Sequence, residues 1–313
     1  MKIIFAASLA VFVIAVFAAD TNQSLTRVVL ATNKVEIKIF GEYRVVLANG
    51  MPDHAPGEFP NAHNPNQITA QNFTFKLPLH PLAAANSTPA NGAWFGVALN
   101  GVPFEPGTAE FWNGQREWTF EAKSGAIDLG LDAHNAHVQP NGSYHYHGLP
   151  TGLLKKLGGR TNAMTLVGWA ADGFPIYTPY GHRVATNAAS ELKQLTSSWQ
   201  LKKGDRPEFT PEGKYNGAFT ADYEYVKGSG DLDECNGRVG VTPEFTNGTY
   251  YYCITEEFPQ LARSWRGLPD SSFFKRRPLP QLGQPGMTEY PREHPLRPSR
   301  RRPLDAPPSA PPP

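Results

Sequence analysis

Eight Asn-Gly pairs are spread along this 313-residue chain, and they constrain its fold more strongly than any other feature of the sequence. Both residues tolerate a positive φ angle, so the pair is a strong signal for a tight hairpin turn. Glycine (29 residues) and proline (30 residues) together approach a fifth of the chain, which disfavours a helix bundle. The asparagines of these pairs are Asn49, Asn91, Asn100, Asn113, Asn141, Asn216, Asn236 and Asn247.

The segments between these turns have the patterns of strands. Residues 35–39 alternate strictly between apolar and charged side chains, as a half-buried strand does. We expect two short helices, one at 153–157 and one at 188–195 that follows Asn187 as a possible N-cap. The predicted fold is mainly β, a β-sandwich or irregular barrel with a few short helices and a possible internal duplication. Four further segments are rich in aromatic and β-branched residues, namely 72–76, 165–170, 223–226 and 250–255.

Residues 1–18 are predicted to be a signal peptide. Lys2 precedes an almost unbroken apolar run, and small residues stand before a cleavage point near Ala18 or Ala19. An uncleaved membrane anchor is the alternative, but a run of roughly 15 to 17 apolar residues is short for a spanning helix, which needs about 20. We therefore expect a secreted or periplasmic protein with no transmembrane segment after signal removal.

Residues 275–313 are predicted to be a disordered tail rich in proline and arginine. Such a composition cannot bury enough apolar surface to fold, and we expect the tail to be solvated, with contact to an anionic surface as the alternative. The tail is basic, whereas the net charge of the chain is only +1, so the body is mildly acidic. This charge argues against nucleic acid as the main partner and is compatible with cation binding.

Four of the nine histidines lie within the eighteen residues 131–148. His145 and His147 are two positions apart, directly after an Asn-Gly turn. On an extended strand both imidazoles point to one face and the neighbouring phenols of Tyr144 and Tyr146 point to the other. Two imidazole nitrogens at this spacing can converge on one metal ion. The spacing therefore predicts that these two histidines are metal ligands.

The segment before the turn supplies further candidate ligands. A hairpin-like return brings His134 or His137 alongside the pair, and Asp132 adds a carboxylate. Histidine ligands with an optional carboxylate suit zinc, copper or non-haem iron better than calcium or magnesium. Copper and zinc are the expected metals. The alternative is a set of buried, hydrogen-bonded histidines that brace a turn without a metal.

A second region looks like a diverged copy of this segment. Asn236 matches Asn135, and residues 247–250 match residues 141–144, with about five extra residues between these anchors in the second copy. Chance similarity between two Asn-Gly hairpins is the alternative. A real duplication predicts that the two segments share their backbone geometry.

The two cysteines of the chain fall at paired positions of the second copy. Cys235 stands where the first copy has His134, and Cys253 stands where it has His147. In an exported protein we expect them to form a disulfide, which requires Cα atoms about 4.4 to 6.8 Å apart.

Three blocks of the sequence carry a family resemblance. They are residues 142–147, preceded by an Asn-x-His element, residues 168–181, and residues 233–252. In this order they resemble the YHYH domain family of exported proteins, which is named for its motif rather than for a reaction. The resemblance implies a YHYH domain, which we place at 91–274, after a strand-rich N-terminal segment at 19–90. The third block has Tyr251 and Cys253 in place of histidines, so we expect no second metal site there.

Asp172 has two interpretations. It is either the Asx-turn residue of the Asp-Gly-Phe-Pro segment or a carboxylate that orients one of the metal-binding imidazoles. No nucleophile elbow, phosphate-binding loop, dinucleotide fingerprint or zinc-protease helix is found in the sequence. Three functions therefore compete: a metal-binding protein, a metal-dependent secreted hydrolase or oxidoreductase with an open metal position, and a metal-free structural or interaction module of the cell surface.

Overall fold

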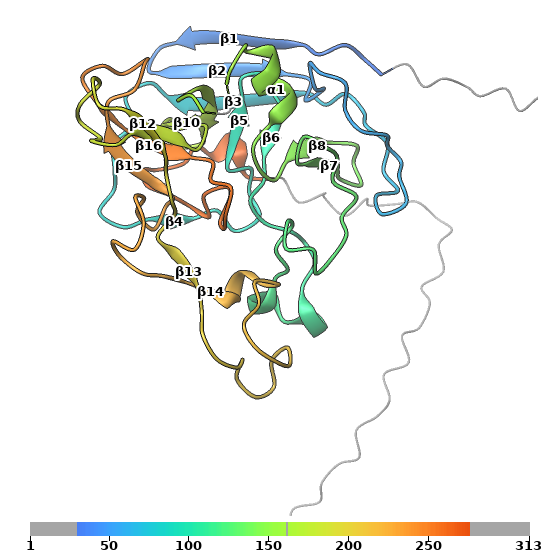
Figure 1. Ribbon diagram of the computed structural model, residues 1–313. Coiled ribbons are helices and arrows are strands. Elements are labelled where there is room, and N and C mark those ends of the chain that lie inside the picture. Colours follow the sequence, from blue (N-terminus) through green and yellow to red (C-terminus); the bar gives the residue numbers. More distant parts are fainter. Residues whose placement is uncertain (1–29, 161, 276–313) are drawn as a thin grey trace, which may run out of the picture. The chain divides into compact units, whose positions relative to one another are not determined.

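The computed structural model describes residues 30–160 and 162–275 (Figure 1). The predicted signal peptide at 1–18 lies outside the described residues, as does all of the predicted tail except Lys275. Among the described residues, no helix has both the length and the apolar character needed to cross a membrane.

A mixed eight-stranded sheet runs through the centre of the body. Among the described residues the sheet does not close into a barrel, because its two end strands do not pair with each other. The prediction of a mainly β fold is confirmed, in the form of open sheets. In spatial order the strands are β15 (Gly237–Gly240), β16 (Thr249–Cys253), β10 (Pro175–Tyr177), β9 (Leu166–Ala170), β5 (Gly96–Ala98), β6 (Pro103–Phe104), β8 (Tyr144–Tyr146) and β7 (Ala136–Val138).

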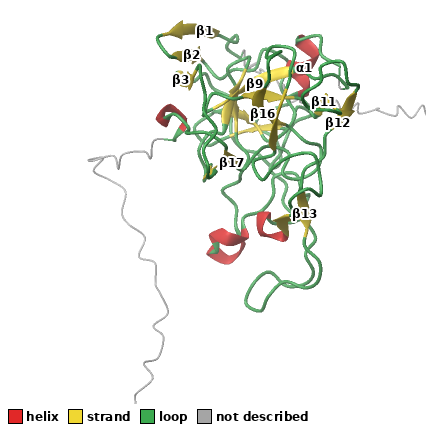
Figure 2. Ribbon diagram, turned by 90° about the vertical axis from the view of Figure 1, so that its left-hand side faces the viewer, coloured by secondary structure: helices red, strands yellow, loops and turns green. Residues whose placement is uncertain are grey.

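A three-stranded antiparallel sheet lies against this body in both views (Figures 1 and 2). It consists of β1 (Val35–Phe40), β2 (Tyr43–Ala48) and β3 (Phe73–Pro78), in that spatial order. Val46, Phe75 and Leu77 are almost fully buried on its inner side and belong to the main hydrophobic core. The same core contains residues of β5, β8, β9 and β16. The two sheets are therefore joined by one apolar core.

Shorter elements complete the fold. They are the pairs β11 (Tyr180–His182) with β12 (Leu192–Gln194), β13 (Trp199–Leu201) with β14 (Tyr223–Tyr225) and β4 (Thr88–Pro89) with β17 (Ser264–Trp265), the helix α1 (Thr151–Lys156), and the 3-10 turns η1 (Trp112–Gly114), η2 (Arg116–Trp118), η3 (Thr220–Asp222) and η4 (Ser271–Phe273).

The first of the two predicted helices is confirmed as α1, and the second is wrong. Asn187 does accept a hydrogen bond from the backbone N–H of Ala189 at 2.9 Å, but this contact closes a turn rather than a helix. The chain then enters β12, whose residues pair with β11. Pairing in a ladder here overrides a weak local helix preference.

Candidate metal site

Two strands position the histidines of the motif. His137 lies on β7 and His145 on β8, and the register of the two antiparallel strands places these residues directly opposite each other. His147 follows β8 by one residue and lies on the same side of the strand as His145. The phenols of Tyr144 and Tyr146 point to the other side, into the main core. The alternation of the strand thus separates the imidazoles from the phenols, as predicted.

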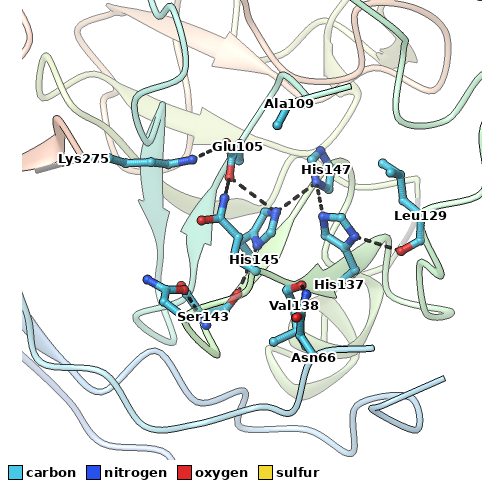
Figure 3. Close-up of polar contacts among 12 residues, drawn as sticks. Asn66, Glu105, Ala109, Leu129, His137, Val138, Ser143, His145, His147 and Lys275 are labelled. Carbon is cyan, nitrogen blue, oxygen red and sulfur yellow. Dashed lines mark hydrogen bonds and ion pairs between the residues drawn. The ribbon is translucent and has the colours of Figure 1, made fainter. Parts of the chain in front are cut away.

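The three imidazoles meet at their Nε2 atoms (Figure 3). The Nε2 of His147 lies 3.0 Å from the Nε2 of His145 and 3.1 Å from the Nε2 of His137. Two ligands of a tetrahedral zinc ion, each at 2.0–2.1 Å, are roughly 3.3 Å apart. The ligand atoms of the three residues all lie within 4.8 Å of one another. The two spacings from the Nε2 of His147 are thus close to those of a metal-bound set.

The hydrogen bonds of the Nδ1 atoms indicate which tautomer His137 and His145 adopt. The Nδ1 of His137 lies 2.9 Å from the carbonyl of Leu129, and the Nδ1 of His145 lies 3.2 Å from the carbonyl of Ser143. A carbonyl only accepts, so each Nδ1 donates and each Nε2 carries a lone pair that faces the centre. The side-chain amide nitrogen of Asn64 lies 3.2 Å from the same Nδ1 of His137, and it donates a hydrogen bond to the carbonyl of Val138 at 3.0 Å.

His147 cannot donate a hydrogen bond to the Nε2 atoms of both His145 and His137. A proton on its Nε2 can point to one of the two facing lone pairs, and the other then has no donor. The Nδ1 of His147 is buried and has no hydrogen-bond partner. A cation at the centre would accept all three lone pairs at once, which is the reason that this geometry suits a metal.

A buried carboxylate lies at the edge of the group. The Oε2 of Glu105 is 3.4 Å from the Nε2 of His145 and accepts a 2.5 Å hydrogen bond from Gln139. Its Oε1 forms an ion pair with Lys275, whose ammonium also lies over the ring of Trp94. A cation at the centre would lie near this carboxylate, whose negative charge favours it. Our sequence reasoning missed Glu105, and the only available signal is a lone acid in the apolar stretch 102–106.

Burial keeps the imidazoles neutral. His145 is 1% exposed and His147 is 4% exposed. Burial lowers the pKa of both well below the usual value, and the neighbouring histidines lower it further. Burial also lowers the pKa of His137, although the Leu129 carbonyl opposes the shift. Neutral imidazole is the form that binds metals.

Two predicted ligands lie outside the histidine group. The Nδ1 of His134 contacts the hydroxyl of Thr151 at 2.8 Å, and its Nε2 contacts the carbonyl of Ala55 at 3.1 Å. His134 lies in the turn before β7, and the left-handed backbone of Asn135 redirects the chain between it and His137. The carboxylate of Asp132 is occupied by hydrogen bonds from its own loop, from Tyr144 and from Gly57, and it is not a member of the group.

Asp172 lies outside the histidine group and bonds to other residues of the fold. Its Oδ1 accepts a 3.3 Å hydrogen bond from the backbone N–H of Phe174, the contact of an Asx turn. Its Oδ2 accepts from the hydroxyl of Tyr252 at 2.5 Å and from the backbone N–H of Gly267 at 2.8 Å. Burial raises the pKa of Asp172 to about 6, although these hydrogen bonds oppose the shift.

The loop before β7 has a defined backbone pattern. The N–H of Asp132 donates to the carbonyl of Ala136, and the N–H of Asn135 donates to the carbonyl of Asp132. Asn135 has a φ angle of 58°, in the left-handed region that asparagine tolerates. The N–H of His147 then donates to the carbonyl of Asn135 at 2.7 Å. The loop thereby fixes the end of β8, where His147 stands.

The second copy repeats this backbone pattern bond for bond. The N–H of Asp233 donates to the carbonyl of Gly237, and the N–H of Asn236 donates to the carbonyl of Asp233. Asn236 has a φ angle of 55°, and its carbonyl accepts from the N–H of Cys253 at 3.0 Å. The strands that follow pair in the same register, with Arg238 opposite Tyr251. Both segments are therefore built on one structural template.

The side chains at the three metal positions differ between the copies. In the second copy the Nε of Arg238 donates to the hydroxyl of Tyr251 at 2.7 Å, and no histidine is present. The positions of His137, His145 and His147 correspond to Arg238, Tyr251 and Cys253.

The predicted disulfide is wrong, and both thiols are free. Cys253 is adjacent to Asn236 in the ladder, so the backbones meet, but the side chains of the two cysteines enter different clusters. Cys235 packs in the main core with Tyr250, whereas Cys253 packs with Tyr251 in a second cluster. Alternation along β16 turns Cys253 away from Cys235.

Comparison with known proteins places the chain in one family. No curated protein and no solved structure matches it significantly. The family model described as "YHYH protein" matches residues 74–267, which is more than half of the 313 residues. The matched region contains the Tyr-His-Tyr-His segment with all three converging histidines and the second copy of the hairpin. The chain belongs to the YHYH protein family.

Proposed function

We propose that this protein binds a transition-metal ion of the zinc or copper type through the Nε2 atoms of His137, His145 and His147. One observation carries the proposal: three buried or half-buried imidazoles converge, and the hydrogen bonds at two of them direct their lone pairs to the same point. The unpartnered Nδ1 of His147 and the adjacent carboxylate of Glu105 support it. Copper or zinc follows from the all-nitrogen ligand set.

The proposal is tested by metal analysis of the purified chain and by titration of the metal-free chain with zinc and copper. The substitution His147→Ala removes the ligand that contacts both others, and we expect it to weaken binding by more than about 100-fold, beyond the loss typical of residues that only orient a ligand. His134→Ala is the matched control, because His134 lies in the same segment but outside the group. A metal-free chain that takes up neither ion, or equal affinity in the two variants, refutes the proposal.

A metal-dependent enzyme is the second candidate, because three protein ligands are the number that catalytic zinc sites use. A fourth position would then be left for water or substrate. Cobalt substitution tests this: a visible spectrum that changes on addition of azide indicates an exchangeable position, and an unchanged spectrum indicates a closed site. A metal-free structural module, the third alternative, predicts that His145→Ala lowers the melting temperature equally with and without zinc.

We further propose that the protein is exported, on the evidence of the apolar N-terminal segment. N-terminal sequencing of the secreted or periplasmic material tests this. Mature chains that begin near residue 19 or 20 support the proposal, and a chain that retains its first residues contradicts it.

A further inference from the structure

The outer strand of the small sheet has a free edge. β1 pairs with β2 on one side, and among the described residues no strand pairs with its other side. In Figure 2, β1 is the outermost of the three strands. The far edge of the sheet is covered instead, where the backbone N–H of Lys76 on β3 donates to the hydroxyl of Ser272 at 2.9 Å. The sheet thus has one edge available for another strand.

Apolar side chains are exposed along this free strand. Ile37 is 43% exposed and Ile39 is 63% exposed. Ile37 pairs with Val46, which is 1% exposed, so both lie on the core-facing side of the sheet. The apolar face of the sheet therefore extends beyond the core that it covers. Phe40 at the turn, on the other face of the strand, is 78% exposed.

The backbone groups on the free edge belong to alternate residues. Lys34 accepts a hydrogen bond from the backbone N–H of Asn49 on the side of β2, so the even-numbered residues bond toward β2. The N–H and C=O groups of Val35, Ile37 and Ile39 therefore point outward. An added antiparallel strand must place its own outward groups opposite these three residues.

Among the registers centred on the middle of β1, charge favours one for a second copy of the strand. With the two-fold axis at Ile37, Glu36 of each copy lies opposite Lys38 of the other, and Val35 lies opposite Ile39. The neighbouring registers that keep the hydrogen bonds place Glu36 opposite Glu36, or Lys38 opposite Lys38. Opposite charges in facing positions stabilise a strand pair and like charges destabilise it.

We infer that two copies of this chain associate through antiparallel pairing of their β1 strands around Ile37. The pairing joins the two small sheets into one six-stranded sheet, satisfies both free edges and places Ile37 of one copy beside Ile37 of the other. Such an isologous contact closes after two copies. Only residues 35–39 of β1 pair with each other in this register, so the interface is smaller than about 800 Å² per partner and the dimer is reversible.

Sedimentation velocity of the purified chain over a wide concentration range tests the inference, with and without chelator. We expect a monomer–dimer equilibrium that chelator does not change. Glu36→Lys and Lys38→Glu each place like charges opposite each other twice, and each should weaken the dimer by about 10-fold. Both side chains are exposed, so neither substitution threatens the fold. Glu224→Lys, at an exposed position on β14, is the control and should leave association unchanged.

Mixing the two variants gives the sharpest result. Position 36 of one variant then faces position 38 of the other with opposite charges at both contacts, so the mixture should associate as well as the unmodified chain. A chain that stays monomeric at every concentration, single variants that associate normally, or a mixture that does not associate each overturns the inference. Association that disappears with chelator overturns it as well, because a shared metal would then join the copies.

Discussion

Asp132 and His147 were both predicted as metal ligands, and the structure places only His147 in the histidine group. The Oδ1 of Asp132 accepts from the backbone N–H groups of His134 at 2.8 Å and Ala136 at 3.2 Å. Its Oδ2 accepts from the N–H of Gly57 at 3.0 Å and from the hydroxyl of Tyr144 at 2.6 Å. We therefore predict that Asp132→Ala mainly lowers stability, whereas His147→Ala mainly lowers metal affinity.

The magnitudes follow from these contacts. Each of the four hydrogen bonds of Asp132 contributes about 1 kcal/mol net, so Asp132→Ala should lower the free energy of unfolding by about 4 kcal/mol. Tyr144 is fully buried, and its hydroxyl loses its acceptor. His147 has an unpartnered buried Nδ1, so removing the ring relieves an unsatisfied group while losing packing. Without metal, His147→Ala should change the free energy of unfolding by no more than about 1 kcal/mol.

Urea unfolding with and without zinc separates the two effects. At a free zinc concentration 100 times the dissociation constant, binding adds about 2.7 kcal/mol to the stability of the unmodified chain. The Asp132→Ala variant should keep this increment, and the His147→Ala variant should lose it. If Asp132→Ala does not fold, Asp132→Asn, which retains one acceptor oxygen, should show about half of the stability loss and the full increment. A folded Asp132 variant without the zinc increment would refute the assignment of this carboxylate to the scaffold.

Three further predictions concern residues outside the histidine group. The pKa of Asp172 is about 6 in the folded chain and near 3.8 when unfolded, so the folded state binds the proton more tightly. Relative to Asp172→Asn, the free energy of unfolding should therefore fall by about 3 kcal/mol in total as pH rises from about 3 to about 7, and it should stay constant above that. Urea unfolding that shows a rise over this pH range would contradict this. Burial raises the pKa of Cys235 and Cys253 to about 12, so neither thiol should react with a thiol reagent in the folded chain. After unfolding without reductant both thiols should react, and fewer than two reactive thiols would indicate a disulfide. Asn135→Ala should lower the free energy of unfolding by about 2 to 3 kcal/mol in thermal unfolding, because alanine is strained in the left-handed region and the 2.8 Å hydrogen bond to the Leu149 carbonyl is lost. Asn135→Gly should regain the part of this loss that is due to strain. Equal losses in the two variants would contradict this reasoning.

The sequence predicted those parts of the site that depend on local geometry. The side chains of His145 and His147 had to share a face because they are two residues apart on a strand, and an Asn-Gly turn made a return strand with His137 plausible. Glu105 could not be found in this way, because it directly follows β6 and reaches the group only through the parallel pairing of β6 with β8. Such non-local contacts leave no spacing signal.

The error at the cysteines has a related cause. The match between the two copies correctly placed Cys235 and Cys253 in adjacent backbone segments, since Asn236 bonds to the N–H of Cys253. A disulfide also depends on the direction of each Cα–Cβ bond, which a loop such as that around Cys235 sets through its own turn. Sequence alignment of two copies gives positions along the chain and does not give these directions.

The two copies of the hairpin also bear on why the histidines are present. The loop bonds, the left-handed asparagine and the facing register are the same in both, so these features are what the hairpin fold requires. The second copy folds with an arginine–tyrosine hydrogen bond at the facing positions, which shows that this backbone does not need imidazoles there. Three neutral histidines with two lone pairs directed at one buried point are, without a cation, a less favourable solution than that bond. The hairpin fold alone therefore does not account for the histidine group, which supports the proposed metal site.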